Sequence, residues 1–142
     1  MSRNFLHVLL IRASAVHKKR SRHSFQQLNL TEGQPKVLSI LRDIEGCQQK
    51  ELAEACHVEP ATMTALLKNM EQSDLIFKEK QQLPGGKRAY SIFLTEHGKK
   101  AADEVIKIVE DLEQVAFQGF ADKEKETFLE LFARVAYNLE EQ

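Results

Sequence analysis

The fold is decided by residues 48–76, QQKELAEACHVEPATMTALLKNMEQSDLI. The second half of this stretch predicts an amphipathic helix, because apolar side chains recur in it at 3.6-residue spacing. These side chains belong to Met63, Leu66, Leu67 and Met70. Pro60 suits the first helical position, where its missing N–H costs nothing. The first half carries a shorter apolar stripe that includes Leu52, and Val58 lies between the two, so the stretch predicts a helix-turn-helix.

The opposite face of the second helix carries small and polar side chains that could read DNA. Threonine and alanine methyl groups can meet the thymine methyl, asparagine can pair with adenine, and lysine can reach guanine or phosphate. The residues of this helix that we expect to contact DNA are Pro60, Ala61, Thr62, Thr64, Ala65, Lys68 and Asn69. Pro60 and Ala61 would touch the DNA backbone. The alternative is an ordinary solvated helix face, and the stretch alone does not decide between the two.

A β-hairpin is predicted directly after the helix-turn-helix, in the place of a wing. Residues 76–80 and 90–94 are β-prone, and the Pro-Gly-Gly sequence between them is a strong hairpin signal. The segment has a local surplus of three positive charges, from Lys78, Lys80, Lys87 and Arg88 against Glu79. We expect Lys87 and Arg88 to contact DNA, with Arg88 drawn into the minor groove by its negative potential. An ordinary surface hairpin is the alternative.

Two helices are expected before this core. Residues 2–24 have an apolar side and end in a basic run, which we interpret as a solvated helix end because the negative end of a helix dipole favours cations. The next helix should open with Thr31 and Gln34 as a capping box, in which each side chain satisfies an otherwise unpaired N–H. Gly46 should end it.

Two helices are expected after the hairpin. Thr95 should cap a helix over residues 96–119, and a last helix should follow Asp122. The first helix and these two offer more apolar surface than one compact monomer buries, which indicates a second subunit. A twofold dimer would present two recognition helices to half-sites about one DNA turn apart.

The predicted fold is therefore mainly α with a small β-hairpin wing, a winged helix-turn-helix with N- and C-terminal dimerisation helices. The chain of 142 residues should form one domain. Within it, residues 1–29 and 96–142 would be the dimerisation helices, and residues 30–95 the DNA-binding core.

Charge is distributed unevenly, although the formal net charge is only −1. Residues 1–30 hold six Lys and Arg and no Asp or Glu, whereas residues 96–142 hold six basic and twelve acidic residues. Positive charge that is concentrated locally can attract DNA even when the sum is near zero. Binding would then weaken with salt, because neutralised phosphates release counterions.

Several other classes of protein do not fit the sequence. No apolar run approaches the roughly 18 residues of a membrane span, and the basic cluster follows the N-terminal apolar run instead of preceding it, which argues against an export signal and for a cytoplasmic protein. We find no nucleophile–base pairing and no phosphate-binding glycine loop, so we expect no enzyme and no cofactor. The histidines lack metal-ligand spacing, so we expect no metal site.

The two cysteines fit no disulfide or metal framework. Cys56 lies on an apolar stripe and should be a core residue, since buried cysteine behaves as a small hydrophobe. Cys47 falls in a turn between helices, which should be exposed enough to oxidise. Whether either cysteine senses oxidation is not decided by the sequence, and we do not favour that role.

The assembled pattern resembles the MarR family of bacterial transcriptional regulators. The resemblance is carried by Leu30-Thr31-x-x-Gln34-x-x-Val37-Leu38, Glu51-Leu52-Ala53, Thr62-Met63-Thr64-x-Leu66, Leu75-Ile76 and Leu94-Thr95-x-x-Gly98. It covers nearly the whole chain in the order of the family. It implies a homodimer that binds double-stranded DNA at a pseudo-palindromic operator, and in this family small ligands or oxidation often cause release. The family's peroxide sensors usually carry a cysteine in the first helix, and this chain has none there.

The wing departs from the family pattern. The family usually has Asp-x-Arg before the second strand, whereas this chain has Gly86-Lys87-Arg88. A glycine there should loosen the wing tip and add ordering entropy to DNA binding. A different class of function therefore stays open, a winged-helix scaffold for protein partners with little specific DNA binding. The operator, the regulated genes, the direction of regulation and the effector with its site are not readable from the sequence.

Overall fold

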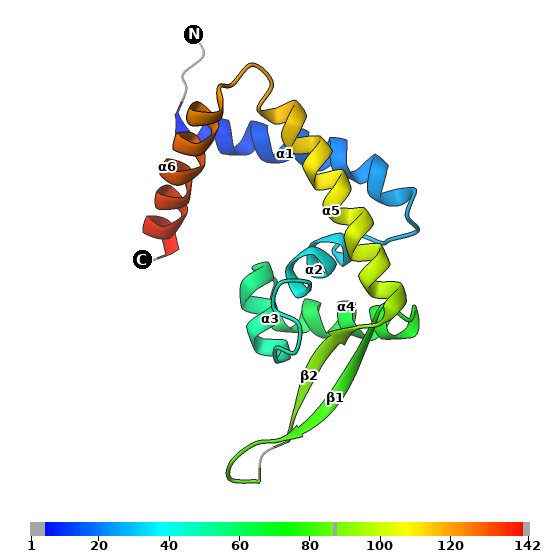
Figure 1. The fold of residues 1–142 in the computed structure, drawn as a ribbon. Helices are drawn as coiled ribbons and strands as arrows, with labels where there is room; N and C mark the ends of the chain where they lie inside the picture. The colour runs from blue at the N-terminus through cyan, green and yellow to red at the C-terminus, as the bar shows by residue number, and fades with distance from the viewer. Residues whose placement is uncertain (1–4, 87, 141–142) are drawn as a thin grey trace. The chain divides into compact units, whose positions relative to one another are not determined.

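The computed structural model describes residues 5–86 and 88–140, with the side chain of Arg88 outside that description. In chain order the elements are α1 (Leu6–Gln26), α2 (Gln34–Leu41), α3 (Gln49–Cys56), α4 (Pro60–Gln72), β1 (Ile76–Gln82), β2 (Arg88–Leu94), α5 (Glu96–Ala116) and α6 (Asp122–Glu140) (Figure 1). The predicted fold class, helices with one antiparallel hairpin after a helix-turn-helix, is confirmed. Contacts divide the chain into two compact units, Met1–Val109 and Glu110–Gln142, and each is described by itself.

One apolar core holds the first unit together. It is built by α2, α3, α4, both strands and the first half of α5. Its buried residues are Leu30, Val37, Leu38, Leu41, Cys47, Leu52, Ala53, Cys56, Met63, Leu67, Met70, Leu75, Ile76, Ile92, Leu94, Ala102 and Val105. The helical periodicity of the sequence predicted the contribution of α4 correctly, because Met63, Leu67 and Met70 are fully buried and Leu66 packs against the same core.

The second helix is shorter than predicted. We expected it to continue to Gly46, but α2 ends at Leu41 and the next residues form tight turns, in which the Ile44 N–H donates to the Leu41 carbonyl. Gly46 then leaves the helical path, with φ at +91°, and its N–H donates to the Ile92 carbonyl at 2.8 Å. After Leu41 the backbone therefore changes from helical hydrogen bonds to i→i−3 turns, and Gly46 bonds to β2 instead of to a helix.

The start of α2 confirms half of the predicted capping box. The Thr31 N–H donates to Gln34 Oε1 at 3.1 Å, as expected. The Gln34 N–H, however, donates to the Thr31 backbone carbonyl instead of its hydroxyl, and the residue that precedes the helix is Gly33, with φ at +90°. A Cβ on Gly33 would lie 2.9 Å from Leu66 Cδ2, so the absent side chain lets α2 start close against α4.

The junction between the hairpin and α5 is tied to the end of α4. The Thr95 hydroxyl accepts the Gly98 N–H at 2.9 Å, which confirms the predicted cap, and donates to the Asp74 carbonyl at 2.5 Å. Gly98 lies directly against Leu75, because a Cβ on Gly98 would be 1.9 Å from the Leu75 carbonyl oxygen. The glycine of this motif therefore permits a close approach of backbone to backbone.

The helix α1 exposes most of its apolar side chains. Its exposed large apolar residues are Leu6, Val8, Leu9, Leu10, Ile11 and Val16. Ser21 is the residue of α1 that is buried. Within the described part of the first unit, α1 therefore leaves its apolar side without cover.

The second unit consists of the last turns of α5, a short connection and α6. Its phenylalanine rings form a chain: Phe117 meets Phe120 and Phe128 edge to face, with ring centroids 5.3 and 5.8 Å apart, and Phe128 stacks on Phe132 at 5.5 Å. Lys125 Nζ lies 5.0 Å from the centre of the Phe117 ring. No residue of α6 over Asp122–Glu140 is buried, so these rings remain at the surface of the unit.

Candidate nucleic-acid interface

The recognition motif is formed by α3, a three-residue turn and α4. A capping box begins α3, with the Gln48 side chain accepting a backbone N–H and the Gln48 N–H donating to Glu51 Oε1 at 3.3 Å. His57 takes the left-handed conformation, with φ at +52°, and ends the helix. Val58, partly buried, packs against the core between the two helices, as its position in the sequence predicted. The chain then enters α4 at Pro60, which occupies the first turn as expected.

All seven residues of α4 that were predicted to contact DNA lie on its exposed side. They are Pro60, Ala61, Thr62, Thr64, Ala65, Lys68 and Asn69. The buried side of the same helix is apolar and faces the core. The helix is therefore held from one side, while its small side chains on the other leave the backbone free to approach a groove. Contact of these seven residues with DNA remains a prediction.

One polar contact at this surface was not predicted from the sequence. Gln49 Nε2 donates to Thr64 Oγ1 at 2.7 Å, and the Thr64 hydroxyl in turn donates to the Pro60 carbonyl at 3.0 Å. Gln49 therefore belongs to the candidate interface. Its polarity and its place at the start of α3 were visible in the sequence, but its partner lies 15 residues away.

The hairpin is fixed to the recognition motif through β2. Its strands pair antiparallel, from Ile76 with Leu94 to Gln82 with Arg88. The other edge of β2 pairs with the turn before α3, where the Ile92 N–H donates to the Cys47 carbonyl at 2.9 Å. In addition, the Leu94 N–H donates to Glu45 Oε1 at 2.8 Å. These bonds orient the base of the wing relative to α3 and α4, and the hairpin extends away from these two helices (Figure 1).

The tip of the wing is described only in part. Gly85 and Gly86 both have positive φ, and a Cβ on either would meet no atom within 4 Å, so both belong to an open turn. Lys87 lies outside the described residues. The backbone of Arg88 begins β2 opposite Gln82, and its side chain lies outside the description. The predicted contacts of Lys87 and Arg88 with DNA therefore stay predictions.

The basic end of α1 interacts within the chain. Lys18 Nζ lies 3.0 Å from the Glu32 carboxylate and Arg22 lies 3.9 Å from the same oxygen. The hydrogen bond and the charge of Lys18, with the charge of Arg22, hold the pKa of Glu32 below its usual value. The interpretation of the basic run as a solvated helix end without a DNA role stays a prediction.

Comparison with known proteins decides the family. The sequence profile described as MarR family matches residues 30–90, which span α2 to the start of β2. The uncharacterized HTH-type transcriptional regulator YybA of Bacillus subtilis (strain 168) is 35% identical over 118 residues, which cover 82% of this chain and 76% of YybA. The chain belongs to the MarR family of transcriptional regulators.

Solved structures of the family have the same fold. A putative MarR-family transcriptional regulator from Listeria monocytogenes, crystallised in complex with a 26mer DNA, superposes with a TM-score of 0.82 at 26% identity, covering 97% of this chain and 90% of the other. The crystal structure of MarR superposes with a TM-score of 0.79 at 28% identity, covering 98% and 94%. The family is one of transcriptional regulators and not a class of enzymes.

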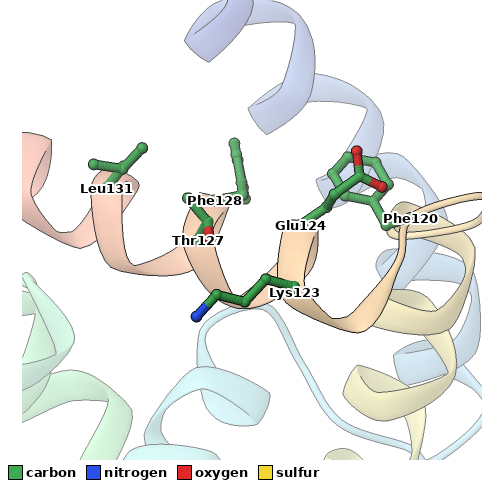
Figure 2. Close-up of a pocket in the computed structure, with 6 residues that line it drawn as sticks. All are labelled: Phe120, Lys123, Glu124, Thr127, Phe128 and Leu131. Atoms are coloured by element: carbon green, nitrogen blue, oxygen red, sulfur yellow. The ribbon is translucent and has the colours of Figure 1, made fainter.

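The rest of this MarR-family chain offers no metal cluster, but it has two shallow surface hollows in the part that the structure describes. Across residues 5–86 and 88–140, no cluster of three or more His, Cys, Asp or Glu could hold a metal ion. None of the helices in that same part of the chain combines the length and the apolar character of a membrane span. A shallow hollow in the first unit lies beside His97, Lys100 and Glu104 at the start of α5. Another, on the second unit, has Phe128 and Leu131 projecting from one side of α6 (Figure 2).

Both cysteines of this MarR-family chain are buried. For Cys56 this confirms the predicted core position. For Cys47 the expectation of an exposed turn was wrong, because β2 covers the residue through its pairing with the Cys47 backbone. Burial raises the pKa of the Cys47 thiol, and the nearby Glu51 carboxylate adds to this; burial also raises the pKa of Cys56, which Lys36 offsets only in part.

We expect both thiols to be unreactive in the folded protein. A raised pKa keeps a thiol protonated, and the thiolate is the reactive form. Iodoacetamide at pH 8 should alkylate the native protein much more slowly than the urea-unfolded protein, in which both sites should be modified, as intact mass would show. Unfolded thiols ionise near pH 8.5, and the folded thiols ionise only at higher pH. The free energy of unfolding should therefore be unaffected by these thiols below that pH and should fall as pH rises above it. Rapid labelling of Cys47 in the native state would contradict the burial.

Proposed function

We propose that the chain is a homodimeric repressor that binds a pseudo-palindromic operator and is released by a small effector. One observation carries the DNA-binding part: α4 is anchored by a fully buried apolar face while small and polar residues occupy its exposed side. Such a helix can enter the major groove, which admits an α-helix and displays the base edges. As a regulator of chromosomal DNA it would act in the cytoplasm.

Exposed apolar side chains support the homodimer. Within each unit taken separately, α1 exposes Leu9 and Ile11, and α6 exposes Leu131, Phe132 and Leu139, with 41–60% of the surface of each residue accessible. Contiguous apolar side chains exposed at the surface of a protein often mark an interface. We propose residues 1–29 and 96–142 as the dimerisation helices and residues 30–95 as the DNA-binding core. A second copy would set two α4 helices about one DNA turn apart.

Release by a small effector would work by a shift between two conformations of the dimer. In one conformation the spacing of the two α4 helices would fit the operator, and in the other it would not. A ligand that binds the second conformation more tightly would shift the dimer toward it and so lower its affinity for DNA. The hollow beside His97, Lys100 and Glu104 is also lined by residues 28–30 before α2 and by Ser73 and Leu75 after α4. We propose it as the site of such a ligand.

Fluorescence anisotropy on duplex DNA tests the proposed function. The purified protein would be titrated onto the duplex from upstream of its own gene and onto scrambled DNA, at several salt concentrations. We expect preference for the native duplex, two chains per site at saturation, and affinity that falls with salt because counterions are released. Weak, equal binding to both duplexes, followed by failure to select any sequence from genomic DNA, would favour the winged-helix protein scaffold instead.

Arg88 gives a test of the wing. If its side chain enters the minor groove, Arg88→Ala should lower operator affinity by about tenfold, as expected for the loss of one charged contact with DNA. The slope of log affinity against log salt concentration should also become smaller by about one. Lys78→Ala, at a partly buried position near the base of the same hairpin, is the matched control and should change affinity less. Unchanged affinity of Arg88→Ala would refute a DNA role for this residue.

A further inference from the structure

Thr64 is held by two hydrogen bonds on the exposed side of α4. Its hydroxyl donates to the Pro60 carbonyl, four residues earlier in the same helix, at 3.0 Å. The same oxygen accepts a hydrogen bond from Gln49 Nε2 on α3 at 2.7 Å. The contact bridges the two helices of the recognition motif at the surface that we assign to DNA.

These bonds use most of the capacity of the hydroxyl. A threonine hydroxyl has one proton to donate and two lone pairs to accept with. The proton is committed to Pro60 and one lone pair to Gln49, so the hydroxyl has no proton left to donate to a base. What Thr64 can offer to DNA is mainly its methyl group.

The same bonds fix where that methyl group lies. In a helix, the side chain of threonine divides between two staggered positions, because its hydroxyl can bond to the carbonyl one turn back. Fixing Oγ1 also fixes Cγ2, since both are attached to the same carbon. At helical spacing Thr64 lies beside Ala61 and Lys68, both of them exposed, so its methyl adds to a small apolar surface next to one positive charge.

We propose that Thr64 recognises the 5-methyl group of a thymine through Cγ2, and that Gln49 is the positioning residue that holds it there. Contact between the methyl groups of threonine and thymine is a known form of base readout in the major groove. The inference rests on the proposed function, because it requires α4 to lie in that groove. It assigns a role in sequence specificity to Gln49, a residue of the other helix.

Substitution of thymine by deoxyuridine isolates the contact, because deoxyuridine lacks the 5-methyl group and keeps every hydrogen-bonding atom. Each thymine of an operator selected by the wild-type protein would be replaced in turn. We expect one thymine in each half-site at which the replacement weakens wild-type binding about fourfold, which corresponds to ~0.8 kcal/mol for one buried methyl-sized group. Thr64→Ser keeps the hydroxyl and loses the methyl, so it should bind the thymine and deoxyuridine duplexes equally at that position.

Gln49→Ala tests the positioning role. Releasing the hydroxyl should let the Thr64 side chain rotate, so the preference for thymine over deoxyuridine should fall clearly below the wild-type ratio. In a Thr64→Ser background, Gln49→Ala should not change that ratio further, although it can change overall affinity. Gln118→Ala, the same substitution at an exposed site in the second unit, is the control and should preserve the wild-type ratio.

The outcomes separate this inference from the proposed function. The inference would be overturned if Thr64→Ser kept the full preference for thymine over deoxyuridine at every thymine, or if Gln49→Ala did. Either result would leave the proposed regulator function intact. A wild-type protein that binds a selected operator with no sensitivity to deoxyuridine would do the same. Failure of the wild-type protein to select any operator would overturn the proposed function itself, and this inference with it.

Discussion

Gly98→Ala is expected to destabilise the protein by about 3 kcal/mol or more, which is at the upper end for overpacking a well-packed contact. The added Cβ would lie 1.9 Å from the Leu75 carbonyl oxygen and 2.9 Å from the Leu75 carbonyl carbon. Neither atom can rotate away, because both belong to the backbone. The start of α5 and the end of α4 would have to separate, which would also disturb the Thr95 bond to Asp74.

The sign of this effect distinguishes the close contact from ordinary helix propensity. In an exposed helix interior, replacing glycine by alanine stabilises by about 1 kcal/mol. Urea unfolding followed by far-UV circular dichroism would measure the change, with Lys100→Ala, exposed on the same helix, as a control that should be nearly neutral. A Gly98→Ala protein more stable than wild type would contradict the close approach.

Lys68→Glu is expected to lower operator affinity by about 100-fold or more at low salt. It removes a positive charge from the exposed side of α4 and places a negative charge against the phosphate backbone. Since Lys68 is exposed, the substitution should leave the free energy of unfolding nearly unchanged. The loss should shrink as salt screens the repulsion.

Lys107→Glu is the matched control for Lys68→Glu. Like Lys68→Glu, it makes the net charge of the chain, which is −1, more negative by two units, but it does so at an exposed position on α5. Anisotropy on the selected operator would compare the two variants, with circular dichroism to show that both are folded. Equal losses would mean that total charge, and not the α4 surface, governs binding. A Lys68→Glu protein with wild-type affinity would rule out α4 as the helix that enters the groove.

The sequence by itself determined the elements and the side that each presents. Helical spacing placed Met63, Leu67 and Met70 inside, and the Pro-Gly-Gly sequence between β-prone runs predicted the hairpin. This works because periodicity reports burial along a single element, and because proline and glycine restrict the backbone locally. The fold and the exposed side of α4 could therefore be stated without coordinates. The limits at residues 29 and 95 between dimerisation helices and DNA-binding core remain a proposal.

The tertiary structure decided where separate elements meet. The path of Gly46 and the burial of Cys47 are both linked to the pairing of β2 with the turn before α3. Glu45 adds a bond to β2 across 49 residues. The commitment of the Thr64 hydroxyl to Gln49, and the approach of Gly98 to Leu75, are likewise contacts between different elements. Such contacts depend on how elements pack, and no pattern within one element records them, because the same helix or strand would have the same periodicity against a different neighbour.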